Sequence, residues 1–156
     1  SLSVAAAYGK AKKVVSVDMS ATYTDWAKNN FKLNQFSVDK NLFYQEDVLQ
    51  WLPSFAAKEK EKFDLIIIDP PSFSNSKRMN NIFDVQRDYI MLLKNAEKIL
   101  SKDGKIFFSN NLRSFKFDAQ EFENFEVSSL SEKTVPEDFR NKKIHQSWLL
   151  LRRIDH

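Results

Sequence analysis

The sequence predicts an α/β fold built on a doubly wound, mostly parallel sheet with a C-terminal antiparallel hairpin. Segments with strand and helix patterns alternate along the 156 residues. The run Leu65–Ile68 is continuously apolar, as in a strand covered on both faces of a parallel sheet. Polar residues directly follow several expected strands, which is where ligands bind in such sheets.

The composition indicates one globular domain over residues 1–156. Hydrophobic residues make up 42% of the chain, and the formal net charge of +3 permits a nucleic-acid partner without requiring one. The absence of cysteine excludes a disulfide framework and a thiol nucleophile, and with two histidines we expect no metal site. No apolar run reaches the roughly 20 residues of a membrane span and no signal peptide is visible, so we expect a cytoplasmic protein without membrane contact.

In the first part of the chain, we expect a helix over residues 2–8 that stops at Gly9 and a second helix after Ser20 as its cap. The second helix places Tyr23 and Trp26 on one side, and we expect Trp26, like the other two tryptophans, in the core. The expected elements are a helix over 2–8, a strand over 13–18, a helix over 21–34, a strand over 41–48 and helical structure over 49–62, broken or restarted at Pro53.

The second part begins with the most hydrophobic strand, residues 63–69, and continues with a helix over 84–100 that carries an apolar stripe. Residues 101–104 are expected to turn the chain into a buried strand over 105–111. A short helix over 118–124 and two final strands follow, joined by a polar loop too short for a crossover helix. The expected final elements are strands over 125–134 and 145–153, paired as the antiparallel hairpin.

Four polar sites lie at the carboxyl ends of expected strands: Asp18, Asp47, Asp69 and Asn110–Asn111. Asp18 can accept hydrogen bonds from both hydroxyls of a ribose, as an acidic residue does in dinucleotide folds. Asp47 can accept from the exocyclic amine of an adenine, or it can cap the helix that follows. The alternative for every one of these sites is that Asp and Asn simply favour strand exits and turns.

The segment Asp69–Phe73, with the sequence DPPSF, carries the strongest signal. Each proline fixes φ and lacks an N–H, and the residue before a proline is pushed toward extended geometry. The segment is therefore a rigid rim whose carbonyls are free to accept hydrogen bonds from a base, while Phe73 can stack on the base plane. The alternative is an ordinary Pro-Pro strand terminator.

Basic and aromatic residues follow the expected strands and suit a surface that binds RNA phosphates and bases. Among the basic ones, Arg78 and Arg113 are the candidates we favour for RNA contact, while His145 is expected to pack or to hydrogen-bond. The alternative for the basic residues is a solvated loop surface, which we expect for Lys142 and Lys143. The full set comprises Lys77, Arg78, Arg113, Lys116, Arg140, Lys142 and Lys143, interleaved with Phe73, Phe115, Phe117 and Phe139.

DPPSF resembles motif IV of the Rossmann-like, class I S-adenosylmethionine-dependent methyltransferases, in the variety that modifies base nitrogens. The segments VVSVDMSATYTDWAKNNFKLN, FDLIIIDPPSFSNSKRMNNIFDVQRDYIMLLKNAEKIL, GKIFFSNNLRSF and IHQSWLLLRR extend this likeness over most of the chain. Together they resemble the C-terminal, guanine-N7 catalytic domain of the fused bacterial large-subunit rRNA methyltransferases. The resemblance implies S-adenosylmethionine as cofactor, 23S rRNA or its precursor as partner, and fusion to further N-terminal domains.

The resemblance also implies roles for individual residues. Cofactor binding falls to Asp18, Met19, Asp47, Val48 and Asp69. Catalysis falls to Asp69, Pro70, Pro71 and Phe73, with Asp69 and the proline carbonyls as positioning groups. Substrate binding falls to Ser72, Lys77, Arg78, Asn111 and Arg113.

The chemistry narrows the reaction. A related branch methylates cytosine C5 through a cysteine, which this chain lacks. Guanine N7 already carries a lone pair, so the enzyme needs alignment more than a strong base. Methylation of adenine N6 or guanine N2, in DNA or RNA, fits the same motif. An alternative of another class is an RNA-binding module without catalysis. An NAD oxidoreductase would share only the Asp18 signal.

One part of the family pattern is absent from the sequence. The first strand and the glycine-rich motif I should precede residue 1, and the only glycines are Gly9 and Gly104. That strand would lie between the strands ending at Asp18 and Asp69, so we expect two unpaired strand edges. We therefore expect residues 1–156 to be an N-terminally truncated domain that alone binds the cofactor weakly and is inactive.

Overall fold

The computed structural model describes residues 2–74, 82–139, 142 and 144–153. The chain divides into two compact units, Ser1–Ser54 and Phe55–His156. We call them the N-terminal unit and the C-terminal unit. The expectation of one domain over residues 1–156 stays a prediction.

The N-terminal unit has a small parallel sheet. Its strands β1 (Val15–Asp18) and β2 (Leu42–Gln45) pair in parallel. Its helices are α1 (Leu2–Tyr8), α2 (Ala21–Leu33) and the first part of α3 (Val48–Lys58). The centre of this unit is the fully buried ring of Phe31, which contacts the rings of Phe36 and Phe43 at centroid distances of 5.8 and 5.1 Å.

Helix α2 begins as predicted but buries a different face. The hydroxyl of Ser20 accepts from the N–H of Tyr23, which confirms the cap. The buried positions are Thr24 and Phe31, whereas Trp26 is 59% exposed and contacts the ring of Tyr23. The prediction of a core position for Trp26 is wrong, because the helix turns this residue about 140° away from Phe31.

One of two local predictions about chain breaks needs correction. Helix α3 runs through Pro53 without a break. Pro53 removes one intrahelical donor, but burial of its neighbour Leu52, which is 3% exposed, offsets that loss. Helix α1 ends at Tyr8, directly before Gly9, which confirms the predicted stop, and Lys10 takes the left-handed conformation with φ of 66°.

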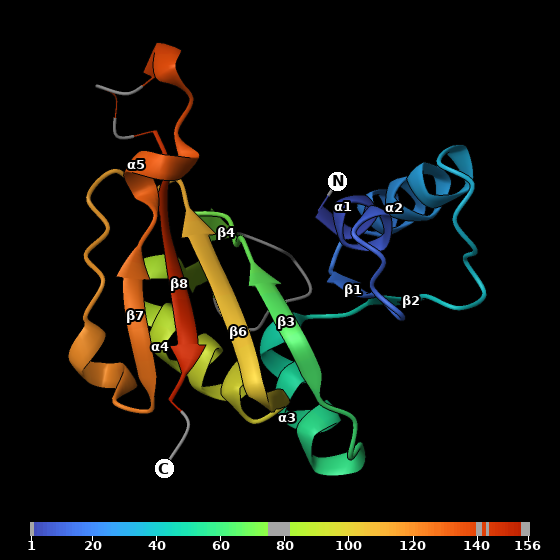
Figure 1. Ribbon diagram of the computed structural model, residues 1–156, viewed down its shortest axis with the longest axis horizontal. Helices are drawn as coiled ribbons and strands as arrows, with labels where there is room; N and C mark the ends of the chain where they lie inside the picture. The colour runs from blue at the N-terminus through green and yellow to red at the C-terminus, as the bar shows by residue number, and fades with distance from the viewer. Residues whose placement is uncertain (1, 75–81, 140–141, 143, 154–156) are drawn as a thin grey trace. The chain divides into compact units, whose positions relative to one another are not determined.

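The C-terminal unit is built on a four-stranded mixed sheet in the order β3-β6-β8-β7. Figure 1 shows β3 (Phe63–Ile68) and β6 (Leu100–Asn110) running the same way and β8 (Gln146–Arg152) running opposite to them. Strand β7 (Phe125–Ser129) lies at the edge and pairs antiparallel with β8, which confirms the C-terminal hairpin, although the strand predicted over residues 125–134 ends at Ser129 and residues 131–134 are helical. The remaining elements are β4 (Phe73–Ser74), β5 (Phe83–Asp84), α4 (Val85–Glu97), η1 (Ala119–Phe122), α5 (Ser131–Thr134) and η2 (Glu137–Phe139).

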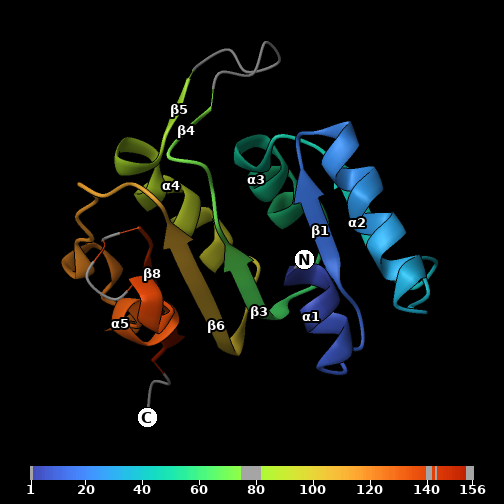
Figure 2. The ribbon, with the colours of Figure 1, turned by 90° about the horizontal axis from the view of Figure 1, so that it is seen from above.

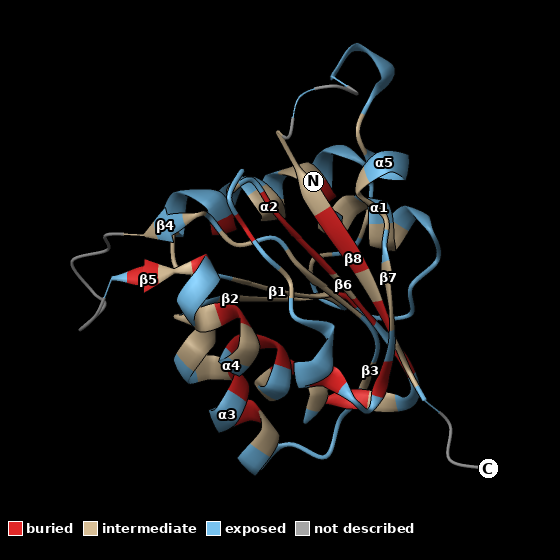
Figure 3. Cartoon of the chain, turned by 90° about the vertical axis from the view of Figure 1, so that its left-hand side faces the viewer, coloured by how far each residue is buried: buried red, intermediate tan, exposed pale blue. Residues whose placement is uncertain are grey.

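Helix α4 has the predicted apolar stripe and forms the core with the sheet. Its buried residues are Val85, Tyr89, Leu92, Leu93 and Ala96. The ring of Tyr89 lies against the ring of Phe108 from β6, and Phe108 in turn lies against Trp148 from β8. Figure 3 shows buried residues along α4 and β8 in red. The predicted core positions of these residues are therefore confirmed.

Strand β6 begins earlier than predicted. Its bounds include residues 101–104, but the pairing with β3 passes from Leu100 directly to Lys105, so these residues still form the predicted turn, as a bulge within the strand. The pairing with β3 shifts register at this point, between Phe63 and Leu65. A Cβ atom on Gly104 would lie 2.5 Å from Cγ of Leu100, four residues earlier, so glycine permits the close approach within this turn.

Strand β3 is less covered than its apolar run predicted. Leu65 is 51% exposed, and no residue of β3 falls in the fully buried class. Within the described ranges, β3 has β6 as its one hydrogen-bonded neighbour and β1 has β2, so each has the open edge that the sequence predicted. None of the helices in the described part of the chain is long and apolar enough to cross a membrane.

Candidate functional site

The segment Asp69–Phe73 leaves the sheet where the sequence placed it. Strand β3 ends at Ile68, and Asp69, Pro71 and Phe73 are exposed. Phe73 shows 57% of its surface to solvent, which is a large fraction for a phenylalanine. The missing N–H groups of the two prolines cost no sheet hydrogen bond, because the strand is complete before them.

Backbone contacts fix the far end of this segment. Phe73 pairs with Asp84 in the short antiparallel β4–β5 ribbon. The carbonyl of Ser72 accepts from the N–H of Val85, the first residue of α4, at 3.1 Å. Figure 2 shows β4 and β5 side by side at the end of the unit where α4 begins. The segment is thus held by β3 at one end and by α4 at the other.

A buried hydroxyl from the neighbouring strand holds Asp69. The Oγ–H group of Ser109 donates to Oδ1 of Asp69 at 2.7 Å, and Ser109 is only 2% exposed. Ile68 pairs with Phe108, so the next residues of the two parallel strands lie level with each other. Ser109 was not among the predicted site residues, although matching the ends of the two apolar strands places it beside Asp69.

The two asparagines after Ser109 differ in their surroundings. Asn110 is fully buried, and its Oδ1 accepts from the N–H of Leu112. Its Nδ2 has no hydrogen-bond partner among the described residues. Asn111 is exposed and lies 3.3 Å from Nδ1 of His145, which confirms the hydrogen-bonding expectation for that histidine.

The loop after β6 divides into an exposed side and a packed side. Arg113 is exposed, as a residue that contacts RNA would need to be. The expectation that Phe115 and Phe117 stack on bases is wrong, because both rings pack on Trp148, at centroid distances of 5.3 and 4.9 Å. Among the other predicted basic residues, Lys77, Arg78, Arg140 and Lys143 lie outside the described residues.

The predicted cofactor residues of the N-terminal unit meet at one edge of its sheet. Asp18 ends β1, is exposed, and accepts from the N–H of Ser20 at 2.7 Å. This bond uses one of about four acceptor sites of the carboxylate, so Asp18 fits a role at ribose hydroxyls. Met19 follows it and is half-buried.

Asp47 lies at the same edge, because β2 runs parallel to β1 and ends two residues earlier. Its Oδ1 accepts from the N–H of Leu49 at 2.9 Å, and its carbonyl accepts from the N–H of Trp51. Asp47 therefore caps α3, one of the two roles predicted for it. It is half-buried, as is Val48, which leaves acceptor capacity beside the strand ends.

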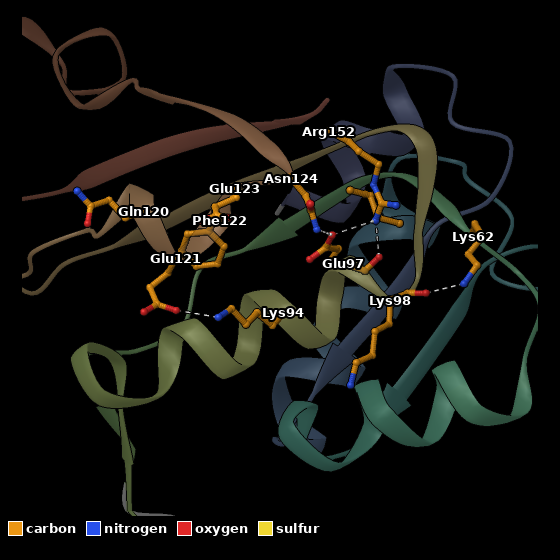
Figure 4. Close-up of a pocket in the computed structure, with 11 residues that line it drawn as sticks. Lys62, Lys94, Glu97, Lys98, Gln120, Glu121, Phe122, Glu123, Asn124 and Arg152 are labelled. Atoms are coloured by element: carbon orange, nitrogen blue, oxygen red, sulfur yellow. Dashed lines mark hydrogen bonds and ion pairs between the residues drawn. The ribbon is translucent and has the colours of Figure 1, made fainter. Parts of the chain in front are cut away.

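A separate hollow of about 860 Å³ lies at the opposite end of β6, near Leu100 (Figure 4). The cations that line it already have partners. Lys94 pairs with Glu121 at 2.7 Å, and the guanidinium of Arg152 donates to the carbonyl of Glu97. Leu100 pairs with Phe63, which lies six residues before Asp69, or about 20 Å along an extended strand. The residues that line the hollow connect α4 to the sheet, and the hollow is not the site at Asp69.

Comparisons with known proteins agree on one family. Residues 1–124 match the family described as S-adenosylmethionine-dependent methyltransferase. The chain is 50% identical, over 95% of its length, to the Ribosomal RNA large subunit methyltransferase K of Neisseria meningitidis serogroup B, and 50% identical, also over 95%, to the Ribosomal RNA large subunit methyltransferase K/L of Cellvibrio japonicus. It spans 42% of the first relative and 19% of the second.

Solved structures agree with the fold. A crystal structure described as a methyltransferase complexed with SAH is 26% identical, with a TM-score of 0.81 over 96% of this chain and 41% of that one. A S-adenosylmethionine-dependent methyltransferase from Agrobacterium tumefaciens, 17% identical, has the same fold with a TM-score of 0.69 over 98% of this chain and 52% of that one. The family match covers well over half of the sequence. The chain belongs to the S-adenosylmethionine-dependent methyltransferases.

Proposed function

We propose that this chain forms part of the catalytic domain of an enzyme that methylates N7 of a guanine in 23S rRNA. The observation that carries the proposal is the Asp69–Phe73 segment, a rigid exposed rim with a held carboxylate at one end and an exposed aromatic ring at the other. The likeness to rRNA large-subunit methyltransferases at 50% identity supports RNA as the substrate.

Residues of the N-terminal unit bind the nucleoside part of the cofactor in this proposal. Asp18 accepts from the ribose hydroxyls, and Asp47 accepts from the adenine amine while it caps α3. Met19 and Val48 supply apolar contact beside them. When bound, S-adenosylmethionine supplies a methyl group on a sulfonium, and the base nitrogen takes this methyl as the carbon–sulfur bond breaks.

Residues of the C-terminal unit hold the base. Phe73 stacks on the purine plane, which is worth about 1–3 kcal/mol for a base on an aromatic ring. Asp69 and the carbonyls of Pro70 and Pro71 face the edge of the base and orient it. Asn111, Arg113 and Ser72 contact the flanking nucleotides, as do Lys77 and Arg78, which lie outside the described residues.

The chemistry at N7 suits this set of groups. The N7 lone pair is available without loss of a proton, so no general base is required. Positive charge develops on the purine as the new bond forms, and the carboxylate of Asp69 stabilises that charge where water is displaced. Asp69 also serves as a binding group near the cofactor. The principal contribution of the rim is to hold N7 in line with the methyl carbon, at about 3 Å.

A second candidate uses the same rim differently. If the target were an exocyclic amine, adenine N6 or guanine N2, the proline carbonyls would accept the amine protons, and a proton would have to leave. The missing N–H groups at Pro70 and Pro71 favour an exocyclic amine as much as they favour guanine N7. The methylated product must therefore be identified. In both cases we infer that the enzyme carries further N-terminal domains and works on rRNA in the cytoplasm.

The product can be identified in cells. A strain that lacks the complete gene is compared with its parent by mass spectrometry of nucleosides from purified 23S rRNA. We expect one 7-methylguanosine to be lost and to return when the wild-type gene is restored. A gene with Asp69→Ala should not restore the mark, whereas a gene with Asp103→Asn, which changes an exposed carboxylate elsewhere on β6, should restore it fully.

Other results would reject the proposal in distinct ways. Loss of 6-methyladenosine or 2-methylguanosine would move the target to an exocyclic amine. Unchanged rRNA together with a lost methyl mark in DNA would change the substrate class. Unchanged nucleic acid of both kinds would favour an RNA-binding module without catalysis.

A further inference from the structure

Ser109 is a buried polar residue whose only side-chain donor is directed at the exposed carboxylate of Asp69. We propose that Ser109 is a positioning residue that sets the orientation of the Asp69 carboxylate toward the base. This inference rests on the proposed function, because it assigns Ser109 a role through Asp69 and not through contact with substrate.

The geometry explains why Asp69 needs such a partner. Asp69 lies one residue beyond the end of β3, where the sheet no longer fixes the backbone through paired hydrogen bonds. An exposed carboxylate there would sample several rotamers in water. A charge-assisted bond from a buried donor on a rigid strand selects one of them and holds Oδ1, which leaves Oδ2 for the base.

The bond is not needed to hold the two strands together. Residues Leu65–Ile68 of β3 are already paired with Lys105–Phe108 of β6 through the backbone. Loss of the hydroxyl would leave the carboxylate of Asp69 in contact with solvent, so no buried charge would be stranded. A variant without the hydroxyl should therefore keep its fold and lose mainly the orientation of Asp69.

The neighbouring strand offers a matched control. Ser147 of β8 pairs directly with Ser109, is fully buried, and shares a hydrogen bond of 2.7 Å with the hydroxyl of Thr134, not with the site. Ser147→Ala removes a buried serine hydroxyl from the same sheet without touching Asp69. Any difference in catalysis between Ser109→Ala and Ser147→Ala then reflects the contact with Asp69.

The experiment measures methyl transfer to 23S rRNA by the protein expressed from its complete gene, with Ser109→Ala, Ser147→Ala, Asp69→Asn and the double variant Ser109→Ala/Asp69→Asn. We expect Ser109→Ala to lower kcat on the order of 10- to 100-fold, as misplacement of a reacting group does, with KM for RNA and cofactor nearly unchanged. Ser147→Ala should keep the wild-type kcat. The double variant should be no slower than Asp69→Asn alone, because Ser109 acts through Asp69.

A second substitution keeps the test valid if Ser109→Ala does not fold. Ser109→Cys retains the size of the side chain but is a weaker donor, and it should give an intermediate kcat. Wild-type kcat in both Ser109 variants, with Asp69→Asn impaired, would overturn this inference and leave the proposed function intact. Losses that multiply in the double variant would also overturn it. Full activity of Asp69→Asn would reject the proposed role of Asp69 itself, and the inference with it.

Discussion

The hydroxyl oxygen of Tyr89 accepts a hydrogen bond of 3.0 Å from the backbone N–H of Asp118. This contact ties α4 to the loop that follows β6, the same loop that carries Asn111 and Arg113. Tyr89 is 1% exposed, and its ring contacts Phe108 and Phe115. Buried contacts of Tyr89 therefore hold the inner side of the loop, although its outer side chains face solvent.

Tyr89→Phe removes this hydrogen bond and leaves the ring contacts in place. Because the N–H of Asp118 then lacks its partner, we expect the free energy of unfolding to fall by about 1 kcal/mol. Urea denaturation of the complete protein measures this change. The matched control is Tyr8→Phe, since Tyr8 is 82% exposed and should contribute nothing. Equal stability of Tyr89→Phe and the wild type would contradict the role given to the hydroxyl.

Tyr89 also predicts a pH dependence of stability. Burial raises the pKa of Tyr89 above its ordinary value of 10.0, because the charged phenolate is poorly solvated in the core. The folded state therefore holds this proton more tightly than the unfolded state. The contribution is fully present below about pH 10 and is lost as the pH rises through the raised pKa.

This loss should disappear in Tyr89→Phe, which has no proton to release at that position. Stability curves of the wild type and the variant, measured by urea denaturation from pH 8 to 11, should converge as the pH rises. Curves that stay parallel over the whole range would contradict the burial effect at Tyr89.

Much of this fold follows from local patterns in the sequence. The stripe on α4, the Ser20 cap and the end of β3 at Ile68 depend on neighbours within a few residues, so the sequence predicts them well. The antiparallel C-terminal hairpin follows from the short, polar connection between two strand patterns. Asp69 and Phe73 were found in the same way, because two prolines restrict the backbone whatever surrounds them.

The errors arise where tertiary contacts decide. Trp26 is apolar and lies at helical spacing, but the sheet of its unit contacts the face of Phe31 instead. Phe115 and Phe117 look like exposed loop residues until Trp148, more than thirty residues later, is placed beneath them. Ser109 is an ordinary strand serine in the sequence, and only the register of β3 against β6 reveals its contact with Asp69.

Phe73 tests the stacking part of the proposal. Phe73→Leu keeps an apolar side chain of similar reach but removes the aromatic face, so we expect kcat/KM for rRNA to fall about 5- to 150-fold, equivalent to about 1–3 kcal/mol of stacking. Phe73→Trp should retain most of the activity. Stability should barely change, since the ring is 57% exposed.

Met91→Ala, on the exposed surface of α4, is the control for Phe73→Leu, since it also alters an exposed apolar side chain of the same unit. Met91→Ala should leave kcat/KM unchanged. A Phe73→Leu enzyme as active as the wild type would show that no base stacks on this ring.

Asp47 has two roles in this account, and substitutions can separate them. Serine caps a helix about as well as aspartate but does not reach as far, so Asp47→Ser should keep the stability of α3 and weaken cofactor binding about tenfold. Asp47→Ala should weaken binding and also lower the free energy of unfolding by about 1 kcal/mol.

Calorimetric titration of the complete protein with S-adenosylhomocysteine, together with urea denaturation, measures both properties of the Asp47 variants. If Asp47→Ser bound the cofactor product as tightly as the wild type, Asp47 would be a helix cap and nothing more.

The nitrogen that receives the methyl group is the central claim, and one substitution in the RNA tests it. Transcripts of 23S rRNA are made with 7-deazaguanosine in place of guanosine, which replaces N7 by carbon and leaves N2 and the Watson–Crick edge intact. Transcripts with 7-deazaadenosine serve as the control for changes in RNA folding. Transfer of labelled methyl groups by the complete protein should vanish on the first RNA and persist on the control, whereas transfer that persists on the 7-deazaguanosine RNA would contradict methylation at guanine N7.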